Sequence, residues 1–374
     1  MLRRILALVK KEFIHLLHDW WMPALMLFGG MLELLLVGWA TSRPMTNLPL
    51  MIWDQDKSAA SRQIITSLEN TGTFRLDDYA ESMEPITYAL DRGKINAAII
   101  IPPNYSEEIA SFDGQPTLSV ILNGAESIPA MEAWRAIEGV TRDIGEGIIV
   151  NRMGIDPDAF QGFGLSLRVW FNEALSEALY STPAELGLML EFTTLLFASL
   201  AFSRERELGT LEQLLVMPFS SLELMIGKAI PVIMISFFDF VLMLGMMHFA
   251  FKVPVRGSLL LLFALAFVYL IVEMSKGMVI SVISKTQHQA FLLVLLIGMG
   301  DFIFTGYAAP VESMPMAIQY IAKIVPSHHW LAIMRGILLK GAGVDVLWPN
   351  VLALLVIGII VVIFSWRFIR RNID

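Results

Sequence analysis

The sequence predicts an integral membrane protein in which six transmembrane α-helices carry one inserted α/β domain. Three observations lead to this fold class. Only 17% of the 374 residues are charged and 56% are hydrophobic, whereas about a quarter of the residues in soluble domains are charged. Several apolar stretches approach the ~20 residues that cross a bilayer. One long segment between the first two of these stretches instead alternates strand-like and helix-like patterns.

The composition also excludes several kinds of chemistry. The chain has no cysteine, which excludes a thiolate nucleophile, a Cys-ligated zinc site and an iron–sulfur centre. Neither a His-Glu-x-x-His motif nor a Gly-x-Ser-x-Gly motif occurs. The sequence therefore predicts no catalytic residue and no metal site.

Charge-poor apolar stretches of membrane-spanning length occur six times. We expect the spans at residues 20–40, 184–203, 229–251, 258–283, 290–311 and 347–366. If the N-terminus is cytoplasmic, the short cytoplasmic segments hold 11 Lys and Arg residues and the short segments opposite hold 5. Cytoplasmic loops carry the excess of Lys and Arg. The N-terminus and the tail at residues 367–374 are therefore predicted to be cytoplasmic.

Residues 41–183 form a long connection that is expected to lie outside the cytoplasm. Strand-like runs occur at 47–53, 95–101 and 117–122, and helix-like runs occur at 58–70, 83–92, 105–112 and 127–153. The segment holds 20 acidic and 10 basic residues, which argues against nucleic acid as a partner. We therefore predict an extracytoplasmic α/β domain between spans one and two.

Residues 1–19 are predicted to form an amphipathic helix on the inner leaflet. Apolar residues from Leu2 to Leu17 follow one helical stripe, and the basic residues Arg3, Arg4, Lys10 and Lys11 lie outside it. The alternative is an ordinary basic flank of the first span.

The cytoplasmic connection at residues 204–228 carries the most informative pattern. A charged cluster at 204–207 precedes Gly209 and Thr210, and a short leucine-rich helix follows and ends at Pro218. A helix this short cannot bury its apolar face alone, so we interpret it as a docking element whose leucines fill a groove of a cytoplasmic protein. The alternative is a surface helix held by its own salt bridges.

Several patterns along the chain occur together in one known family. They are the run from Arg204 to Pro218 followed by Glu223-Leu224 and Gly227-Lys228, the run Trp53 to Asp56 with Ser61, the run Ile101 to Pro103, the run Trp170 to Asn172, and the run Gly306 to Pro315. With these patterns the sequence resembles the ABC-2 type permeases of bacterial ABC exporters, in the drug- and lipid-export-like subgroup with a large extracytoplasmic domain. The resemblance covers nearly the whole chain.

The resemblance implies that residues 204–228 hold a coupling helix, which sits in a cleft of a separate ATPase subunit. The residues expected to take part in coupling are Arg204, Glu205, Arg206, Glu207, Gly209, Thr210, Leu211, Glu212, Leu214, Leu215 and Pro218. The chain has no Gly-x-x-x-x-Gly-Lys-[Ser/Thr] motif. ATP and magnesium are therefore expected on the partner subunit, and no cofactor is expected in this chain. The resemblance also implies a dimer with a second or related permease, and short re-entrant helices on the outer side at residues 312–346.

Ionisable side chains at membrane depth are costly and therefore suggest function. Glu273 and Lys276 are three residues apart, so they share a helix face and are predicted to form a structural ion pair. A proton relay is the alternative for this pair. Glu191 and Asp301 are candidates for polar contacts along the substrate path, because the resemblance places spans two and five beside that path.

Together these features predict the permease subunit of an ATP-driven exporter in the bacterial inner membrane, and not an enzyme in its own right. The expected cargo is amphipathic or hydrophobic, drug-like or lipid-like, and leaves from the cytoplasm or the inner leaflet. Further expected partners are membrane lipid and a periplasmic adaptor. Two alternatives stay open. A proton-coupled secondary transporter would use Glu273, Lys276 and Asp301 as a proton path, whereas a membrane-anchored receptor or assembly platform would need only the outer domain.

Overall fold

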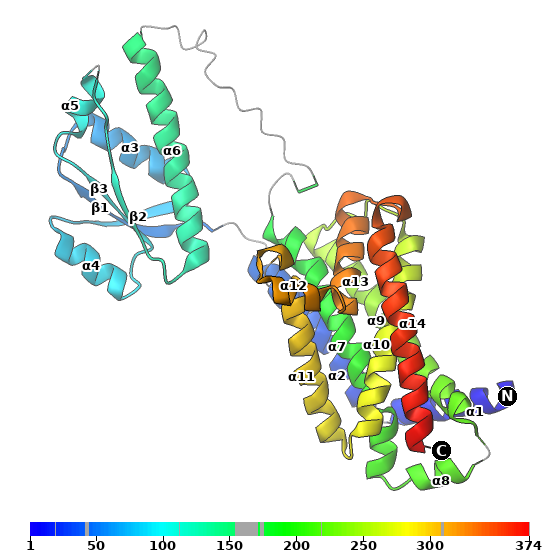
Figure 1. The fold of residues 1–374 in the computed structure, drawn as a ribbon. Helices are drawn as coiled ribbons and strands as arrows, with labels where there is room; N and C mark the ends of the chain where they lie inside the picture. Colours follow the sequence, from blue (N-terminus) through cyan, green and yellow to red (C-terminus); the bar gives the residue numbers. More distant parts are fainter. Residues whose placement is uncertain are drawn as a thin grey trace. The chain divides into compact units, whose positions relative to one another are not determined.

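The computed structural model describes residues 1–18, 20–41, 45–111, 113–153, 171–172, 176–217, 219–307 and 310–373. The chain divides into two compact units. The helical unit consists of Met1–Arg43 and Arg168–Asp374, and the α/β unit consists of Pro44–Leu167. Figure 1 shows both units.

The α/β unit is built on a four-stranded sheet with the order β2-β1-β3-β4. The strands are β1 (Leu48–Asp54), β2 (Phe74–Tyr79), β3 (Ala97–Ile101) and β4 (Ser119–Leu122), and the helices are α3 (Ala59–Asn70), α4 (Met83–Asp91), α5 (Tyr105–Ala110) and α6 (Ser127–Met153). Strands β1, β2 and β3 are parallel, and β4 pairs antiparallel with β3. Helices α3 and α6 pack on one face of the sheet and α4 packs on the other.

The alternation of side chains along β1 explains this two-sided packing. Leu50 and Ile52 point to the α3 and α6 face, and Met51 points to the α4 face. Strands β1, β3 and β4 lie where the sequence pattern predicts strands. The pattern does not predict β2, an edge strand in which Phe74 alone is buried.

The helical unit contains long helices that run side by side in a bundle (Figure 1). In chain order its elements are α1 (Leu2–His18), α2 (Trp21–Thr41), α7 (Glu177–Glu207), α8 (Leu211–Val216), α9 (Ser221–Phe251), α10 (Leu259–Ile283), α11 (Gln287–Phe304), the 3-10 helix η1 (Val311–Ser313), α12 (Met316–Ala322), α13 (Pro326–Arg335), the π-helix η2 (Gly336–Lys340) and α14 (Val344–Ile373).

Five helices within the described residues are long and apolar enough to cross a membrane: Ala178–Glu207, Ser221–Phe251, Leu259–Ile283, Gln287–Phe304 and Val344–Arg371. The sixth expected span, residues 20–40, corresponds to α2, where the apolar stretch Met26–Thr41 is shorter. Helix α7 extends beyond the expected span 184–203 at both ends. Helix α11 ends before the expected residue 311, and Gly306 just beyond it has a left-handed φ of +81°.

Helix α7 forms the centre of the helical unit. It packs against α2, α9, α10, α11 and α13. Two glycines permit close contact with it, because a Cβ at Gly277 of α10 or at Gly298 of α11 would lie 2.5 Å from an atom of Ala198 or Phe192, respectively. These contacts bring α10 and α11 onto the polar face of α7 that forms the candidate site.

Replacement of Gly277 with alanine is expected to destabilise the helical unit by about 1–3 kcal/mol, as overpacking does. The new Cβ would lie 2.5 Å from the Ala198 Cβ and 2.8 Å from the Leu195 backbone oxygen, so α7 or α10 must shift. Gly245→Ala on α9 is the matched control, because nothing lies within 4 Å of its Cβ and helix propensity favours alanine there. Thermal unfolding in detergent measures both variants, and equal stability of the two would contradict this packing.

Candidate functional site

Residues 204–228 fold as the end of α7, a tight turn, the short helix α8 and the start of α9. Gly209 has a φ of +71°, which favours glycine, so the chain leaves α7 there before α8 begins at Leu211. Helix α9 starts with a capping box. The Ser220 hydroxyl accepts a hydrogen bond from the Glu223 N–H, and the Glu223 carboxylate accepts one from the Ser220 N–H.

Glu205 lies at the centre of a partly buried ion-pair network that we call the Glu205 cluster, formed by Lys11, Glu12, Glu205, Thr210 and Lys228. The Glu205 carboxylate accepts hydrogen bonds from Lys11, from Thr210 and, at 3.5 Å, from Lys228. Lys228 also binds Glu12, with the Nζ 2.7 Å from Oε1. The cluster therefore joins α1, α7, α9 and the turn before α8.

Two further charged residues at the end of α7, Arg206 and Glu207, bind the turn between α10 and α11. Arg206 donates to the backbone oxygens of Val282 and Ser284 at 3.0 and 2.5 Å. Glu207 accepts a hydrogen bond from the Gln287 N–H at 2.9 Å. The charged run thus connects several helix ends within this chain.

Helix α8 has one buried and one exposed face. Leu214 is buried and packs with Leu8 and Leu224. The sequence pattern predicts that this leucine fills a groove of a partner protein, but it instead fills a space within this chain. The exposed surface, which we call the α8 surface, consists of Leu208, Gly209, Glu212, Gln213, Val216 and Met217. Leu211 is half-buried. The Leu215 side chain and Pro218 lie outside the described residues, as does Trp170.

A second polar cluster lies where α7, α10, α11 and α13 meet. We call it the Lys276 cluster, formed by Glu191, Glu273, Lys276 and Asp301 with the hydroxyl groups of Tyr269 and Ser327. The Lys276 Nζ is 2.8 Å from Glu273, 2.7 Å from Asp301 and 3.5 Å from Glu191. Carboxylate oxygens of the three acidic residues lie within 4.8 Å of one another.

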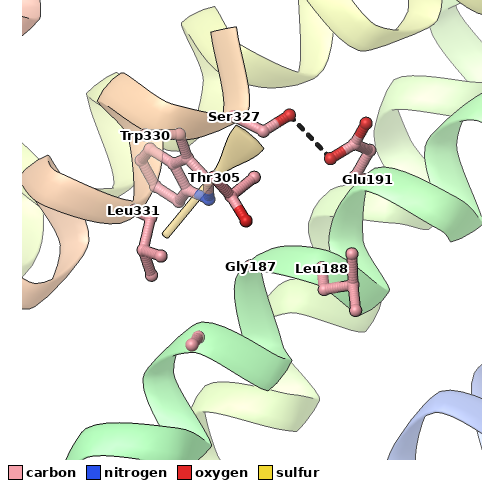
Figure 2. Close-up of a pocket in the computed structure, with 8 residues that line it drawn as sticks. Gly187, Leu188, Glu191, Thr305, Ser327, Trp330 and Leu331 are labelled. Atoms are coloured by element: carbon pink, nitrogen blue, oxygen red, sulfur yellow. Dashed lines mark hydrogen bonds between the residues drawn. The ribbon is translucent and has the colours of Figure 1, made fainter. Parts of the chain in front are cut away.

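Glu191 also binds α13 and α10. It accepts a hydrogen bond from the Ser327 hydroxyl at 2.6 Å and one from the Tyr269 hydroxyl at 3.4 Å. Figure 2 shows the Ser327 bond beside a small cavity lined by Ala184, Gly187, Leu188, Glu191, Thr305, Ser327, Trp330 and Leu331. The cavity of about 10 Å³ has room for roughly one water molecule. Trp330 stacks on Tyr269 with ring centres 5.1 Å apart.

The structure thus brings together residues that the sequence treats separately. Glu273 and Lys276 are neighbours on α10, whereas Glu191 and Asp301 join them from α7 and α11 through Lys276. Sequence reasoning does not identify Tyr269 or Ser327 as members. A single Tyr in an apolar helix, or a Ser after Pro326, carries no signal that separates it from ordinary packing.

In the α/β unit, the run Trp53 to Asp56 forms the turn after β1. Asp54 accepts hydrogen bonds from the backbone of Asp56 and Lys57 and from the Ser61 hydroxyl. Asp56 accepts from both the N–H and the hydroxyl of Ser106. Burial raises the pKa of Asp56, but hydrogen bonds from Ser58 and Ser106 outweigh it and hold this pKa below its usual value. These contacts connect β1, α3 and α5, which gives the run a structural role.

Comparisons with known proteins agree over the whole chain. The family model described as ABC-2 family transporter protein matches residues 20–367. The probable multidrug ABC transporter permease YbhR of Escherichia coli (strain K12) is 27% identical over 373 residues, which cover 100% of both chains. YbhS, with the same description and from the same strain, is 25% identical over 381 residues, covering 100% of this chain and 98% of that protein.

A third relative, the inner membrane transport permease YhhJ of Escherichia coli (strain K12), is 28% identical over 363 residues, covering 96% of this chain and 94% of that protein. YbhR and YbhS are thus described as ABC transporter permeases and YhhJ as a transport permease, and the ATPase of such transporters is a separate subunit. The apolar helices show an integral membrane protein. Because the family match spans most of the sequence, this chain belongs to the ABC-2 family of transporter proteins, as a permease component.

Proposed function

We propose that this permease is the membrane subunit of an ATP-driven exporter, which moves an amphipathic or hydrophobic compound, drug-like or lipid-like, from the cytoplasm or the inner leaflet outward. The observation that supports this most strongly is the pairing of the exposed α8 surface with the buried Glu205 cluster. An ATPase that binds the α8 surface would pull on Thr210, and Glu205 would transmit the movement to α1, α7 and α9.

In the proposed topology α2 is the sixth span, both termini are cytoplasmic, and the α/β unit lies outside the cytoplasm of a bacterium, where a periplasmic adaptor could bind it. The distribution of Lys and Arg supports this orientation. The basic residues of α1 and the pair Arg370 and Arg371 at the end of α14 then lie on the side of α8.

The proposed assembly contains two permease subunits and two ATPase subunits, with ATP and magnesium bound to the ATPases. We place the second permease copy against α11. With α14, this helix is the least buried of the five candidate spans, and it exposes Leu292, Leu296 and Met299. Asp301 on the same helix is 14% exposed at its side chain, so Asp301 and, behind it, Glu191 are the proposed polar contacts of the path.

The test is a pull-down of the tagged permease from native membranes. We expect Glu212→Arg to reduce the amount of co-purified ATPase about tenfold or more, because reversing an interfacial charge costs several kcal/mol and each 1.4 kcal/mol is about tenfold in affinity. Glu84→Arg, the same reversal at an exposed site of α4, is the control and should retain the ATPase. An ATPase that binds the Glu212→Arg protein as it binds the wild type would contradict docking at α8.

A further inference from the structure

The Lys276 cluster contains more acidic than basic groups. If every group were ionised, three carboxylates would face a single ammonium group. Glu191 and Glu273 are fully buried, and the side chains of Asp301 and Lys276 are only 14% and 17% exposed. A buried charge without a counter-charge costs several kcal/mol. The cluster therefore needs additional positive charge.

The hydrogen-bond partners differ among the three acidic residues. Glu191 accepts bonds from Ser327 and Tyr269, and Asp301 is 2.7 Å from the Lys276 Nζ and partly exposed. Both arrangements stabilise a carboxylate. Glu273 forms an ion pair with Lys276 through Oε2 at 2.8 Å, but both of its carboxylate oxygens are buried and have no hydrogen-bond partner among the described residues. Of the three carboxylates, Glu273 therefore has the fewest hydrogen bonds to stabilise a negative charge, and neutralising it removes a buried charge that lacks them.

A proton fits this site better than a metal ion does. The Lys276 ammonium group already occupies the space between the three carboxylates, at 2.7 to 3.5 Å from each. A metal ion such as calcium takes about 6–8 oxygen ligands, whereas the adjacent cavity of about 10 Å³ has room for roughly one water molecule. A proton on a carboxylate oxygen needs no extra ligand.

We propose that Glu273 is an exchangeable proton-binding site of this permease, and that it holds a proton in the arrangement seen here. The titratable side chains that face it are Glu191 from α7, Tyr269 and Lys276 from α10, and Asp301 from α11. The ion pairs of Lys276 depend on how α7, α10 and α11 pack. A movement of α7 would change the charge around Glu273 and therefore its affinity for a proton.

This proton site goes beyond the proposed export function. Only its link to α7 movement rests on that function, because the site itself follows from burial and charge. Its test therefore uses the permease alone, with neither ATPase nor cargo, so the two proposals can fail separately.

The experiment is infrared spectroscopy of the purified permease in lipid nanodiscs. We expect a C=O band of a protonated carboxylic acid that shifts in deuterated water, which shows exchange, and that loses one carboxyl equivalent in Glu273→Gln. Glu84→Gln, the same change at an exposed residue, should leave the band unchanged. Labelling glutamate with carbon-13 should shift the band in the wild type, which separates it from bands of aspartic acids such as buried Asp239.

Two spectroscopic results would overturn the proposal. One is a wild-type spectrum without any glutamic acid band, which needs no variant and so does not depend on the folding of Glu273→Gln. The other is an unchanged band in a folded Glu273→Gln protein. Binding of one radioactive sodium ion by the wild type, lost in Glu273→Gln, would also overturn it, because a metal ion and not a proton would then bind at Glu273.

Discussion

Replacement of Lys276 by methionine is expected to lower the free energy of unfolding of the helical unit by about 3–5 kcal/mol, the cost of breaking a buried ion pair by removing one partner. Among the described residues, Lys276 is the only basic group within 4 Å of Glu191, Glu273 and Asp301. Without it, the charged carboxylates of Glu191 and Asp301 lose their shared counter-charge. Methionine keeps most of the side-chain volume, so the effect reports charge and not a cavity.

Thermal or denaturant unfolding of the purified permease measures this loss. Lys285→Met is the matched control, because Lys285 is exposed just beyond α10 and surface substitutions usually change stability by about 0.5 kcal/mol or less. Adding Glu273→Gln and Asp301→Asn to Lys276→Met should restore part of the stability, because neutral side chains no longer need a counter-charge. If the Lys276→Met and Lys285→Met proteins have the same free energy of unfolding, Lys276 does not balance the charge of the buried acids.

The sequence alone predicts the Lys276 cluster only in part. The spacing of Glu273 and Lys276 places them on one helix face whatever the tertiary structure is, so their proximity is predictable. Their contacts with Glu191 and Asp301 depend on the packing of three helices. That packing is set by Gly277 against Ala198 and Leu195 and by Gly298 against Phe192, and such partners are not visible in a single sequence.

Residues 204–228 likewise combine features that local sequence patterns predict with features that depend on tertiary packing. Gly209 and the charged run mark the turn and the end of α7, which local patterns reveal. Which side of α8 is buried depends instead on α1, whose Leu8 packs with Leu214 and Leu224. The sequence therefore locates the helix, but it assigns Leu214 to the wrong surroundings. Strand β2 is missed for a related reason, because an edge strand buries too few side chains to show an alternating pattern.

Glu205→Gln is expected to separate ATPase docking from transmission of movement. The exposed α8 surface stays intact, so the ATPase should co-purify as it does with the wild type. The amide is neutral and loses the charge-assisted hydrogen bonds to Lys11 and Lys228. Hydrogen bonds to charged groups contribute about 1.5–3 kcal/mol each, which corresponds to a tenfold or larger change in an equilibrium between two states. We therefore expect cargo export to fall about tenfold or more.

The measurement combines the pull-down with an export assay in cells that depend on the tagged permease. Lys228 keeps Glu12 as a partner at 2.7 Å, so Glu205→Gln should remain folded and inserted. Glu312→Gln, the same change at an exposed residue of η1, is the control and should export normally. Loss of the ATPase from Glu205→Gln would place Glu205 in the docking surface itself. Normal export with the ATPase bound would instead show that the movement reaches the membrane helices by another route. The contacts of Arg206 and Glu207 with the α10–α11 turn would then be the next candidates for that route.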